Sequence, residues 1–358
     1  MRETLGPGAV IGILGGGQLG RMLALAAARL GHKCHIYCPD PDSPAFDVAA
    51  ARTVAAYDDR AALDRFAAAV DVVTYEFESV PAETATRLAE VRPVRPSPEA
   101  LGVTQDRFRE KSFVSGRGIA VAPFAPVSCA DELEPAVDAI GTPAVLKTCR
   151  FGYDGKGQAR IGTLGEAGVA WQALGRVPAI LEAFVPFEKE VSIVAARGLD
   201  GAFAAYDLVE NEHENHILRR SVVPAAVPPR LDEAARWIAR EIGDGLGFVG
   251  VFCVEMFVME DRLLVNEIAP RVHNSGHWTL DACLVSQFEQ HVRAICGWPL
   301  GPTARHSDAE MLNLLGKEAL DWLRLAAEPA ALHLYGKVKA RPGRKMGHLT
   351  RLRPRSGA

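Results

Sequence analysis

One segment near the N-terminus constrains the fold of this 358-residue chain more than any other. The apolar run Val10–Leu14 predicts a buried strand, residues 15–20 (GGGQLG) form a glycine loop, and a helical pattern follows as far as Gly31. A second apolar run at 34–37 completes a strand, helix, strand unit. With a further strand predicted at 71–75, this order favours a small doubly wound α/β sheet.

The glycine loop has the spacing GxGxxG at Gly15, Gly17 and Gly20, and Asp40 follows about twenty residues later. This spacing is typical of dinucleotide-binding proteins, in which the pyrophosphate lies at the helix N-terminus. The same geometry suits another phosphate ligand or a purely structural tight turn. The motif alone therefore leaves all three interpretations open.

A second glycine loop follows an apolar strand that carries Lys147. The loop, FGYDGKGQ, contains Gly152, Gly155 and Gly157 together with Lys156. Glycine lets backbone N–H groups approach an anion closely, and the two lysines add positive charge. Because the Walker sequence is absent, we predict a different kind of triphosphate site; a lysine-capped strand with a flexible hairpin is the structural alternative.

Length and composition limit the class of protein. The length predicts more than one domain, and we place them at 1–105, 106–187 and 188–358. A net charge of −4 argues against general binding to nucleic acid or membranes, and no apolar run reaches the roughly 20 residues of a membrane span. Seven dispersed cysteines indicate reduced thiols in a cytoplasm. Small molecules are therefore the expected partners.

Two glutamates are predicted to lie opposite each other on a hairpin formed by residues 251–257 and 263–268. If the turn centres between Glu260 and Asp261, cross-strand partners sum to 521 or 522, and Glu255 then pairs with Glu267. Opposed carboxylates in an apolar hairpin repel each other, and a cation relieves the repulsion. Mg²⁺ shared with nucleotide phosphates fits best, and a salt bridge from one carboxylate to an arginine is the structural alternative.

Three further segments carry candidate chemistry. The loop after the hairpin, APRVHNSGH, brings Arg271 and His273 near the expected metal, while the glutamate of the zinc-protease motif is missing. His213 lies in a polar segment that we interpret as a turn, where a ligand and a solvated residue are equally compatible. Residues 337–355 contain eight Lys or Arg and no acid, which favours a site for one phosphate.

Six ordered motifs resemble those of ATP-grasp enzymes, and more narrowly those of the 5-(carboxyamino)imidazole ribonucleotide synthase family. They are GGGQLGRM, YEFESVP, KTCRFGYDGKGQ, FVPFEKEVS, NEIAPRVHNSGHWT and RPGRKMGHLT. The resemblance covers nearly the whole chain. It implies an α/β and α+β fold class, in which an ATP-grasp fold follows an N-terminal Rossmann-like domain.

The resemblance also implies that ATP binds between the central and C-terminal domains, with Phe184 and Val185 at the adenine. The residues that it places around ATP are Arg107, Lys147, Gly152, Tyr153, Asp154, Gly155, Lys156, Gly157, Gln158, Glu182, Ala183, Phe184, Val185, Glu190, His213, Asn266 and Glu267. Glu255 and Glu267 are the implied Mg²⁺ ligands, in agreement with the hairpin arithmetic.

The implied reaction is the ATP- and bicarbonate-dependent N-carboxylation of 5-aminoimidazole ribonucleotide through carboxyphosphate, giving ADP and phosphate, in de novo purine biosynthesis. Residues that match the ribotide site of the related glycinamide ribonucleotide formyltransferase are Gln18, Leu19, Glu76, Asn274, Lys337, Arg344 and Lys345. The expected catalytic residues are Glu76, Tyr153, Arg271, His273 and Lys345, and the first glycine loop is expected to hold the sugar phosphate. The family is usually homodimeric.

Three other functions stay open. A formate-dependent glycinamide ribonucleotide formyltransferase carries acids where this chain has Gln18 and Asn274, so both positions favour the imidazole substrate. A nicotinamide oxidoreductase is compatible with the first glycine loop alone. A non-catalytic ATP-binding protein is disfavoured because the lysines and both carboxylates are present. Cys149 stands where a basic residue is expected in many relatives.

Overall fold

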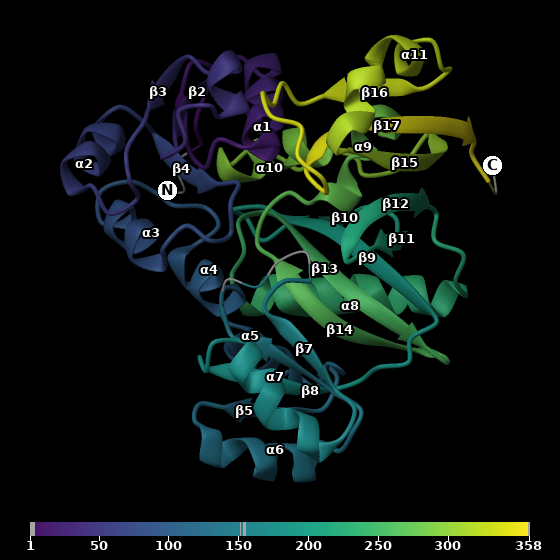
Figure 1. Ribbon diagram of the computed structural model, residues 1–358. Coiled ribbons are helices and arrows are strands. Elements are labelled where there is room, and N and C mark those ends of the chain that lie inside the picture. The colour runs from purple at the N-terminus through teal and green to yellow at the C-terminus, as the bar shows by residue number, and fades with distance from the viewer. Residues whose placement is uncertain (1–3, 151, 153–154, 357–358) are drawn as a thin grey trace.

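A computed structural model describes residues 4–150, 152 and 155–356. The chain forms three β-sheets, seen in Figure 1 as a purple and blue N-terminal part, a teal part at the bottom and a large green and yellow part. The predicted α/β N-terminal sheet and the mainly antiparallel remainder are both confirmed. The division at residues 105 and 187 stays a prediction. No helix among the described residues is long and apolar enough to cross a membrane.

The N-terminal sheet is parallel, with strand order β3-β2-β1-β4. Its strands are β1 (Val10–Leu14), β2 (Lys33–Tyr37), β3 (Ala51–Thr53) and β4 (Val72–Tyr75), and its helices are α1 (Gln18–Arg29), η1 (Pro44–Val48), α2 (Arg60–Ala68) and α3 (Ala82–Ala89). The central strands are buried because helices cover both faces. The predicted strand, helix, strand unit is confirmed, whereas the three-residue β3 is too short for a recognisable pattern.

The central sheet is antiparallel, with order β5-β8-β6-β7. Its strands are β5 (Phe124–Val127), β6 (Ala144–Thr148), β7 (Gln158–Ile161) and β8 (Ala179–Ala183). The helices of this region are α4 (Pro98–Thr104), α5 (Arg107–Ser115), η2 (Ala130–Glu132), α6 (Leu133–Ile140), η3 (Leu164–Glu166) and α7 (Ala167–Ala173). The second glycine loop joins β6 to β7, so it lies at one end of a hairpin.

The largest sheet has the order β14-β13-β9-β11-β12-β15-β17-β16, and β10 also pairs with β9. Its strands are β9 (Lys189–Arg197), β10 (Phe203–Ala205), β11 (Val209–Glu214), β12 (Ile217–Val223), β13 (Gly250–Met259), β14 (Arg262–Ala269), β15 (Ser307–Leu315), β16 (Ala331–Leu334) and β17 (Lys345–Pro354). The helices are α8 (Pro229–Gly245), η4 (Asn274–Gly276), α9 (Thr279–Ala282), α10 (Gln287–Ile295), η5 (Gly316–Asp321) and α11 (Trp322–Ala326).

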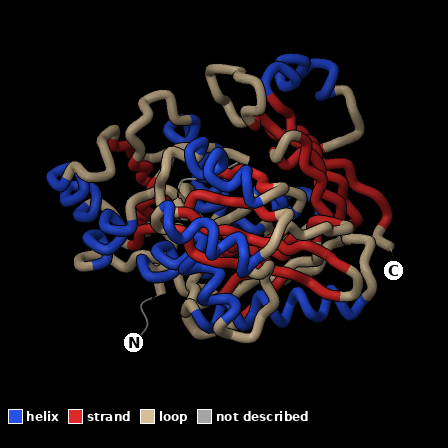
Figure 2. The backbone as a smooth tube through the Cα atoms, turned by 60° about the horizontal axis from the view of Figure 1, so that its bottom comes forward, coloured by secondary structure: helices blue, strands red, loops and turns tan. Residues whose placement is uncertain are grey.

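A buried histidine connects the N-terminal sheet to the largest sheet. His291 lies on α10, where its Nε2 is 2.8 Å from the Thr74 hydroxyl and its Nδ1 accepts a 3.0 Å hydrogen bond from the Val251 amide. The tube view in Figure 2 shows helices in blue lying against strands in red in the central body of the molecule. The carboxyl end of β4 is thereby held near the start of β13, the strand that carries Glu255.

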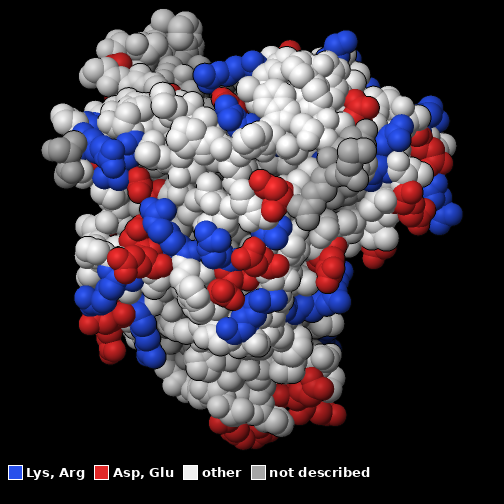
Figure 3. Space-filling view, turned by 180° about the vertical axis from the view of Figure 1, so that it is seen from behind, with Lys and Arg blue, Asp and Glu red and all other residues white. Residues whose placement is uncertain are grey.

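Charge is mixed on the face that Figure 1 turns away from the viewer. The space-filling view in Figure 3 shows Lys and Arg interspersed with Asp and Glu over the described residues of that face.

Candidate active site

Two lysines share one buried carboxylate beside the central sheet. Lys147 Nζ lies 2.9 Å and Lys111 Nζ 3.4 Å from Glu182 Oε2, and all three side chains are largely buried. Burial raises the pKa of Glu182, but the two ammonium groups outweigh it and hold that pKa below the usual value. Burial lowers the pKa of Lys147. Two cations against one anion leave positive charge for a phosphate chain.

Lys111 was missed by the sequence analysis. It is on α5, four residues after Arg107, and it also donates to the Asn266 carbonyl at 3.1 Å. Glu110 on the same helix is buried, accepts a hydrogen bond from the Ile268 amide, and has a pKa raised well above normal by burial and by Glu267. The i, i+3, i+4 spacing of these side chains on one helix face was the available signal.

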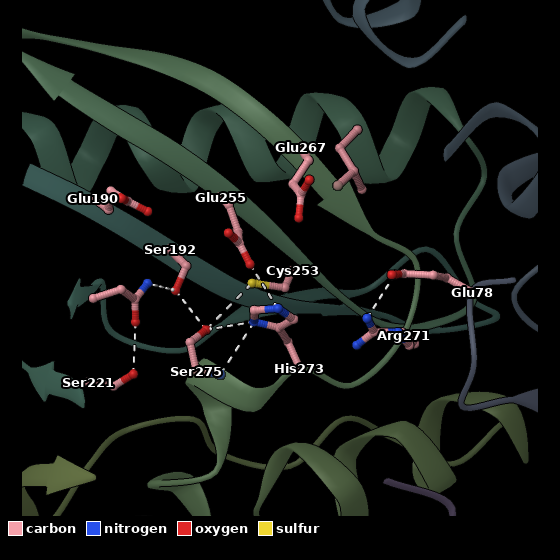
Figure 4. Close-up of polar contacts among 12 residues, drawn as sticks. Glu78, Glu190, Ser192, Ser221, Cys253, Glu255, Glu267, Arg271, His273 and Ser275 are labelled. Atoms are coloured by element: carbon pink, nitrogen blue, oxygen red, sulfur yellow. Dashed lines mark hydrogen bonds and ion pairs between the residues drawn. The ribbon is translucent and has the colours of Figure 1, made fainter. Parts of the chain in front are cut away.

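The predicted pairing of Glu255 with Glu267 is confirmed. From Met259 and Arg262 back to Met256 and Val265 the cross-strand partners sum to 521, and a β-bulge then shifts the register so that Glu255 lies opposite Glu267. Asn266 is the extra residue of this bulge. Since neighbouring residues of a strand point to opposite faces, the bulge is what brings both carboxylates to one face. Figure 4 shows them side by side on neighbouring strands.

Each of these carboxylates has a cationic or polar partner. Glu255 Oε1 lies 2.8 Å from His273 Nε2, and Glu267 Oε2 accepts a 3.1 Å hydrogen bond from Arg107. Glu267 therefore does form the salt bridge to an arginine that the sequence analysis gave as the structural alternative. Burial raises the pKa of Glu255, but His273 outweighs it and lowers that pKa to about 2, so the carboxylate is ionised at neutral pH.

The donor set fits Mg²⁺. Glu255 and Glu267 supply hard oxygen atoms, and Asn266 Oδ1 is buried without a hydrogen-bond partner among the described residues. An orphaned buried carbonyl oxygen next to two carboxylates is what a hard cation satisfies, with phosphate oxygens and water completing the coordination.

The structure describes only part of the second glycine loop, because Tyr153 and Asp154 fall outside the described residues. Gly155 and Gly157 have positive φ values of 77° and 71°, which favour glycine. A Cβ on Gly155 would come within 2.5 Å of the His216 ring, so the loop packs against the β11–β12 turn.

Several other expected ATP residues lie on the strands around this loop. Gln158 begins β7 opposite Lys147, and Ala183 ends β8, just before Phe184 and Val185. The half-exposed Phe184 ring lies 4.7 Å from the Arg160 guanidinium. This exposed aromatic after β8 is available to an adenine.

His213 corrects one interpretation of the sequence. It lies within β11, not in a turn, and its Nδ1 is 2.8 Å from Glu190 Oε2 on β9. Burial lowers the pKa of His213, but contact with Glu190 outweighs this and raises it. The turn is instead at Asn215 and His216, which have positive φ values. The polar sequence concealed the strand because β11 is only partly buried.

The first glycine loop is bound by a carboxylate of the protein itself. Glu76, directly after β4, accepts hydrogen bonds from the Gly17 amide (2.7 Å) and the Gly20 amide (3.3 Å). A Cβ on Gly15 would approach Glu76 Oε1 within 2.6 Å, so glycine is required for this contact. These two amides already have a partner in the protein, and the loop as the sugar-phosphate site stays a prediction. Gln18 and Leu19 begin α1 beside them.

Basic residues of the C-terminal segment lie near this carboxylate. Lys337 Nζ donates to the Lys345 carbonyl at 2.7 Å. Burial lowers the pKa of Lys337 to about 8, against the opposing effect of Glu76. Arg344 donates to the Lys339 carbonyl and lines a cavity of about 150 Å³ with Lys339, Arg341, Asp40 and Asp42.

The loop after β14 presents both charged and unpaired groups. Arg271 donates to Glu78 at 2.8 Å, and burial lowers its pKa while Glu78 and Glu76 raise it above normal. The amide atoms Nδ2 and Oδ1 of Asn274 are buried and have no hydrogen-bond partner among the described residues. A ligand with both donors and acceptors would satisfy them.

His277 belongs to a buried stack of imidazoles. Its ring centroid is 4.8 Å from that of His348, which stacks at 4.4 Å and 9° on His333, and His333 pairs with Asp281 at 3.1 Å. Nearly parallel rings direct their nitrogen lone pairs side by side rather than toward one ion. The group is therefore a stack of imidazole rings with the Asp281 carboxylate at one end.

Comparison with known protein families divides the chain among three models. The ATP-grasp domain matches residues 112–288, the ribonucleotide synthetase preATP-grasp domain matches residues 9–105, and the phosphoribosylaminoimidazole carboxylase C-terminal domain matches residues 309–357.

Individual proteins match over nearly the full length. The N5-carboxyaminoimidazole ribonucleotide synthase of Brucella melitensis is 52% identical over 359 residues, which are 99% of each chain. A crystal structure of an N5-carboxyaminoimidazole ribonucleotide synthetase with ADP gives a TM-score of 0.94 at 41% identity and covers 99% of this chain and 94% of that one. The Aspergillus clavatus synthase, in complex with ADP and 5-aminoimidazole ribonucleotide, gives 0.90 at 31% identity and covers 97% and 94%.

Replacing Glu182 by Gln is expected to destabilise the protein by about 3–5 kcal/mol, because Lys111 and Lys147 then lose a buried counter-charge. Urea denaturation measures the effect. The matched control is Asp64→Asn in the exposed pair with Arg87, which should cost less than about 1 kcal/mol. Equal losses in both variants would contradict the assigned role of Glu182.

Proposed function

Because this chain belongs to the N5-carboxyaminoimidazole ribonucleotide synthase family of ATP-grasp enzymes, we propose residue roles on that premise. The chain is an ATP-dependent ligase that N-carboxylates 5-aminoimidazole ribonucleotide in purine biosynthesis. The observation that carries the assignment of the site is the Glu255–Glu267 pair next to the lysines at Glu182. Bicarbonate as the carbon source, Mg²⁺, a homodimer and a cytoplasmic location belong to the proposal.

The nucleotide binds between the central and largest sheets. Lys147 and Lys111 approach its phosphates, and the glycine loop covers them with backbone N–H groups. Glu255, Glu267 and Asn266 would hold Mg²⁺, which would offset the charge of the phosphate oxygens. The adenine lies against Phe184 and Val185.

Bicarbonate is activated first. One of its oxygens attacks the γ-phosphorus of ATP, the bond to the β-phosphate oxygen breaks, and carboxyphosphate and ADP form. Lys147 and Arg271 offset the charge that develops on the transferred group. His273 and Lys345 position the carboxyl group. Tyr153, for which the structure describes no position, is proposed to shield the intermediate from water.

The ribotide amine then reacts. Its nitrogen attacks the carboxyl carbon, the bond from that carbon to the phosphate oxygen breaks, and the departing phosphate takes the amine proton. Glu76 orients the amine and Asn274 contacts the base, where its two unpaired amide atoms are satisfied. Lys337, Arg344 and Lys345 hold the ribotide phosphate together with the first glycine loop, in which the Gly17 and Gly20 amides donate to Glu76.

ADP release tests the reaction directly. With ATP and bicarbonate alone, ADP release should be slow, and adding 5-aminoimidazole ribonucleotide should make it fast. Glycinamide ribonucleotide with formate should give no ADP release above background. Stimulation by the formate pair would favour the formyltransferase.

The Glu267→Gln variant should lower ribotide-stimulated ADP release on the order of 100-fold or more, because bound metal supplies several kcal/mol of charge stabilisation. The amide still accepts from Arg107, so thermal unfolding should stay close to that of the parent protein. Glu260→Gln, in the exposed turn of the same hairpin, is the matched control and should retain full activity. Normal turnover by Glu267→Gln would refute the metal assignment.

The pH dependence tests Lys337. Its pKa of about 8 means that its ammonium loses a proton as pH rises through 8, so kcat/KM for the ribotide should fall there. Lys337→Arg stays charged and should flatten the profile between pH 7 and roughly 9. The exposed Lys317→Arg variant should keep the profile of the parent. A flat parent profile in this range would argue against a phosphate contact by Lys337.

A further inference from the structure

The Arg271 guanidinium is held by two acceptors that belong to different parts of the chain. Its Nη1 donates to the neighbouring Val272 carbonyl at 3.1 Å, and its Nη2 donates to Glu78 Oε2 at 2.8 Å. Figure 4 draws the contact with Glu78 to one side of Glu255 and Glu267. A guanidinium is planar, so fixing both terminal nitrogens fixes the direction of the whole group.

Only one of these acceptors holds the arginine from outside its own loop. The Val272 carbonyl belongs to the next residue, so it moves together with Arg271. Glu78 is 193 residues away in the sequence and follows β4 of the N-terminal sheet. Each terminal nitrogen also carries a second hydrogen, which these two contacts do not use. A fixed guanidinium can therefore direct those hydrogens at an anion.

The segment that carries Glu78 is fixed at both of its ends. At the first end, the Glu76 amide donates to the Leu14 carbonyl at 3.0 Å, which continues the pairing of β4 with β1. At the second end, Val80 is fully buried and its amide donates to the Phe77 carbonyl at 3.3 Å. A short segment held in this way gives the Glu78 carboxylate a defined position.

A single side-chain amide holds the middle of this segment. Gln105 Nε2 donates to the Glu78 carbonyl at 2.7 Å and also to the Val80 carbonyl, so both of its hydrogens are used. Gln105 is the C-cap residue of α4, and α5, which carries the cations at the nucleotide side of the site, begins two residues later. Gln105 therefore connects the start of α5 to the segment that holds Arg271.

The surroundings of Arg271 explain why its direction needs a fixed partner. Burial lowers the pKa of the guanidinium, but the carboxylates of Glu78, Glu76 and Glu267 outweigh it and raise that pKa above normal. Three carboxylates thus attract the same cation, and only Glu78 forms a hydrogen bond with it among the described residues. Without that bond, the guanidinium would turn toward the other two carboxylates.

We propose that Glu78, held in place by Gln105, is a positioning residue that keeps Arg271 directed at the transferred phosphoryl group and away from Glu267. The inference rests on the proposed function for its effect on turnover. The fixed direction of the guanidinium is a property of the unliganded protein, so it can be measured separately.

Glu78→Ala removes the acceptor, and since the Glu78 side chain is 39% exposed, the truncation leaves little unfilled core. NMR of unliganded protein with labelled arginine reads rotation about the Nε–Cζ bond, and the Arg271 signals are assigned by their loss in Arg271→Lys. The parent should give two separate Nη signals, because each terminal nitrogen has its own partner. Glu78→Ala should merge them through fast rotation, and Glu78→Gln, which keeps an acceptor oxygen, should not.

Turnover should follow the direction of the guanidinium. In Glu78→Ala, kcat should fall about tenfold while KM for ATP stays within about twofold, since small misplacements of a catalytic group are costly. Glu78→Gln should recover kcat to within about threefold of the parent, whereas a role as counter-charge alone would make it as slow as Glu78→Ala. Gln105→Met loses both donors without touching the ion pair, and it should lower kcat about threefold.

A double-mutant cycle shows whether Glu78 acts through Arg271. Lysine keeps the charge but lacks the planar fork, so adding Glu78→Ala to Arg271→Lys should lower kcat by less than about twofold. Asp244→Asn is the matched control, because Asp244 pairs with Arg197 at 2.7 Å and Arg197 also donates to a backbone carbonyl, that of Phe248. This control should leave kcat and the Arg271 signals unchanged.

Three results would overturn the proposal: a single averaged Nη signal in the parent, an unchanged kcat in both Glu78→Ala and Gln105→Met, or a further tenfold loss when Glu78→Ala is added to Arg271→Lys. If Glu78→Ala does not fold, Gln105→Met decides through kcat and the Arg271 signals. Two separate Nη signals in a parent that releases no ADP would leave the positioning intact and contradict the proposed function instead.

Discussion

The repulsion between Glu255 and Glu267 is the constraint on which the rest of the site depends. The bulge at Asn266 places both carboxylates on one face of the sheet, where neither is fully solvated. Their counter-charges come from elsewhere in the chain, Arg107 on α5 and His273 after β14. Folding must therefore bring α5 and the loop after β14 to the carboxylates, and the same contacts offset the negative charge of the pair.

Around this pair the charged residues separate into two regions. Lys111 and Lys147 lie toward the central sheet with Glu182, as a triphosphate requires. Arg271 lies toward the N-terminal sheet, where it pairs with Glu78 and is influenced by Glu76. The carboxylates lie between the two groups of cations. A phosphoryl group that leaves the nucleotide would thus remain close to positive charge on both sides.

Local patterns made the hairpin predictable, because strand register follows from turn position and the period of two. The same arithmetic could not choose between 521 and 522, since a bulge has no clear sequence signal, and the structure uses both. Lys111 was missed because its partner, Glu182, is 71 residues away on another element. Glu76 was expected at the ribotide, but its binding to the glycine loop depends on β4 lying next to β1. Contacts of this kind, between residues far apart in the sequence, depend on which strands and helices the fold places side by side.

The contacts of His291 determine which parts of the protein can separate. Its ring is fully buried and joins Thr74 of the N-terminal sheet to Val251 of the largest sheet, so parting them would leave two polar groups and an apolar surface exposed. The N-terminal sheet and the largest sheet are consequently expected to move as one unit. The central region contacts this unit through charged groups, Lys111 at the Asn266 carbonyl and Arg107 at Glu267, so a charged ligand that enters there would compete for those contacts.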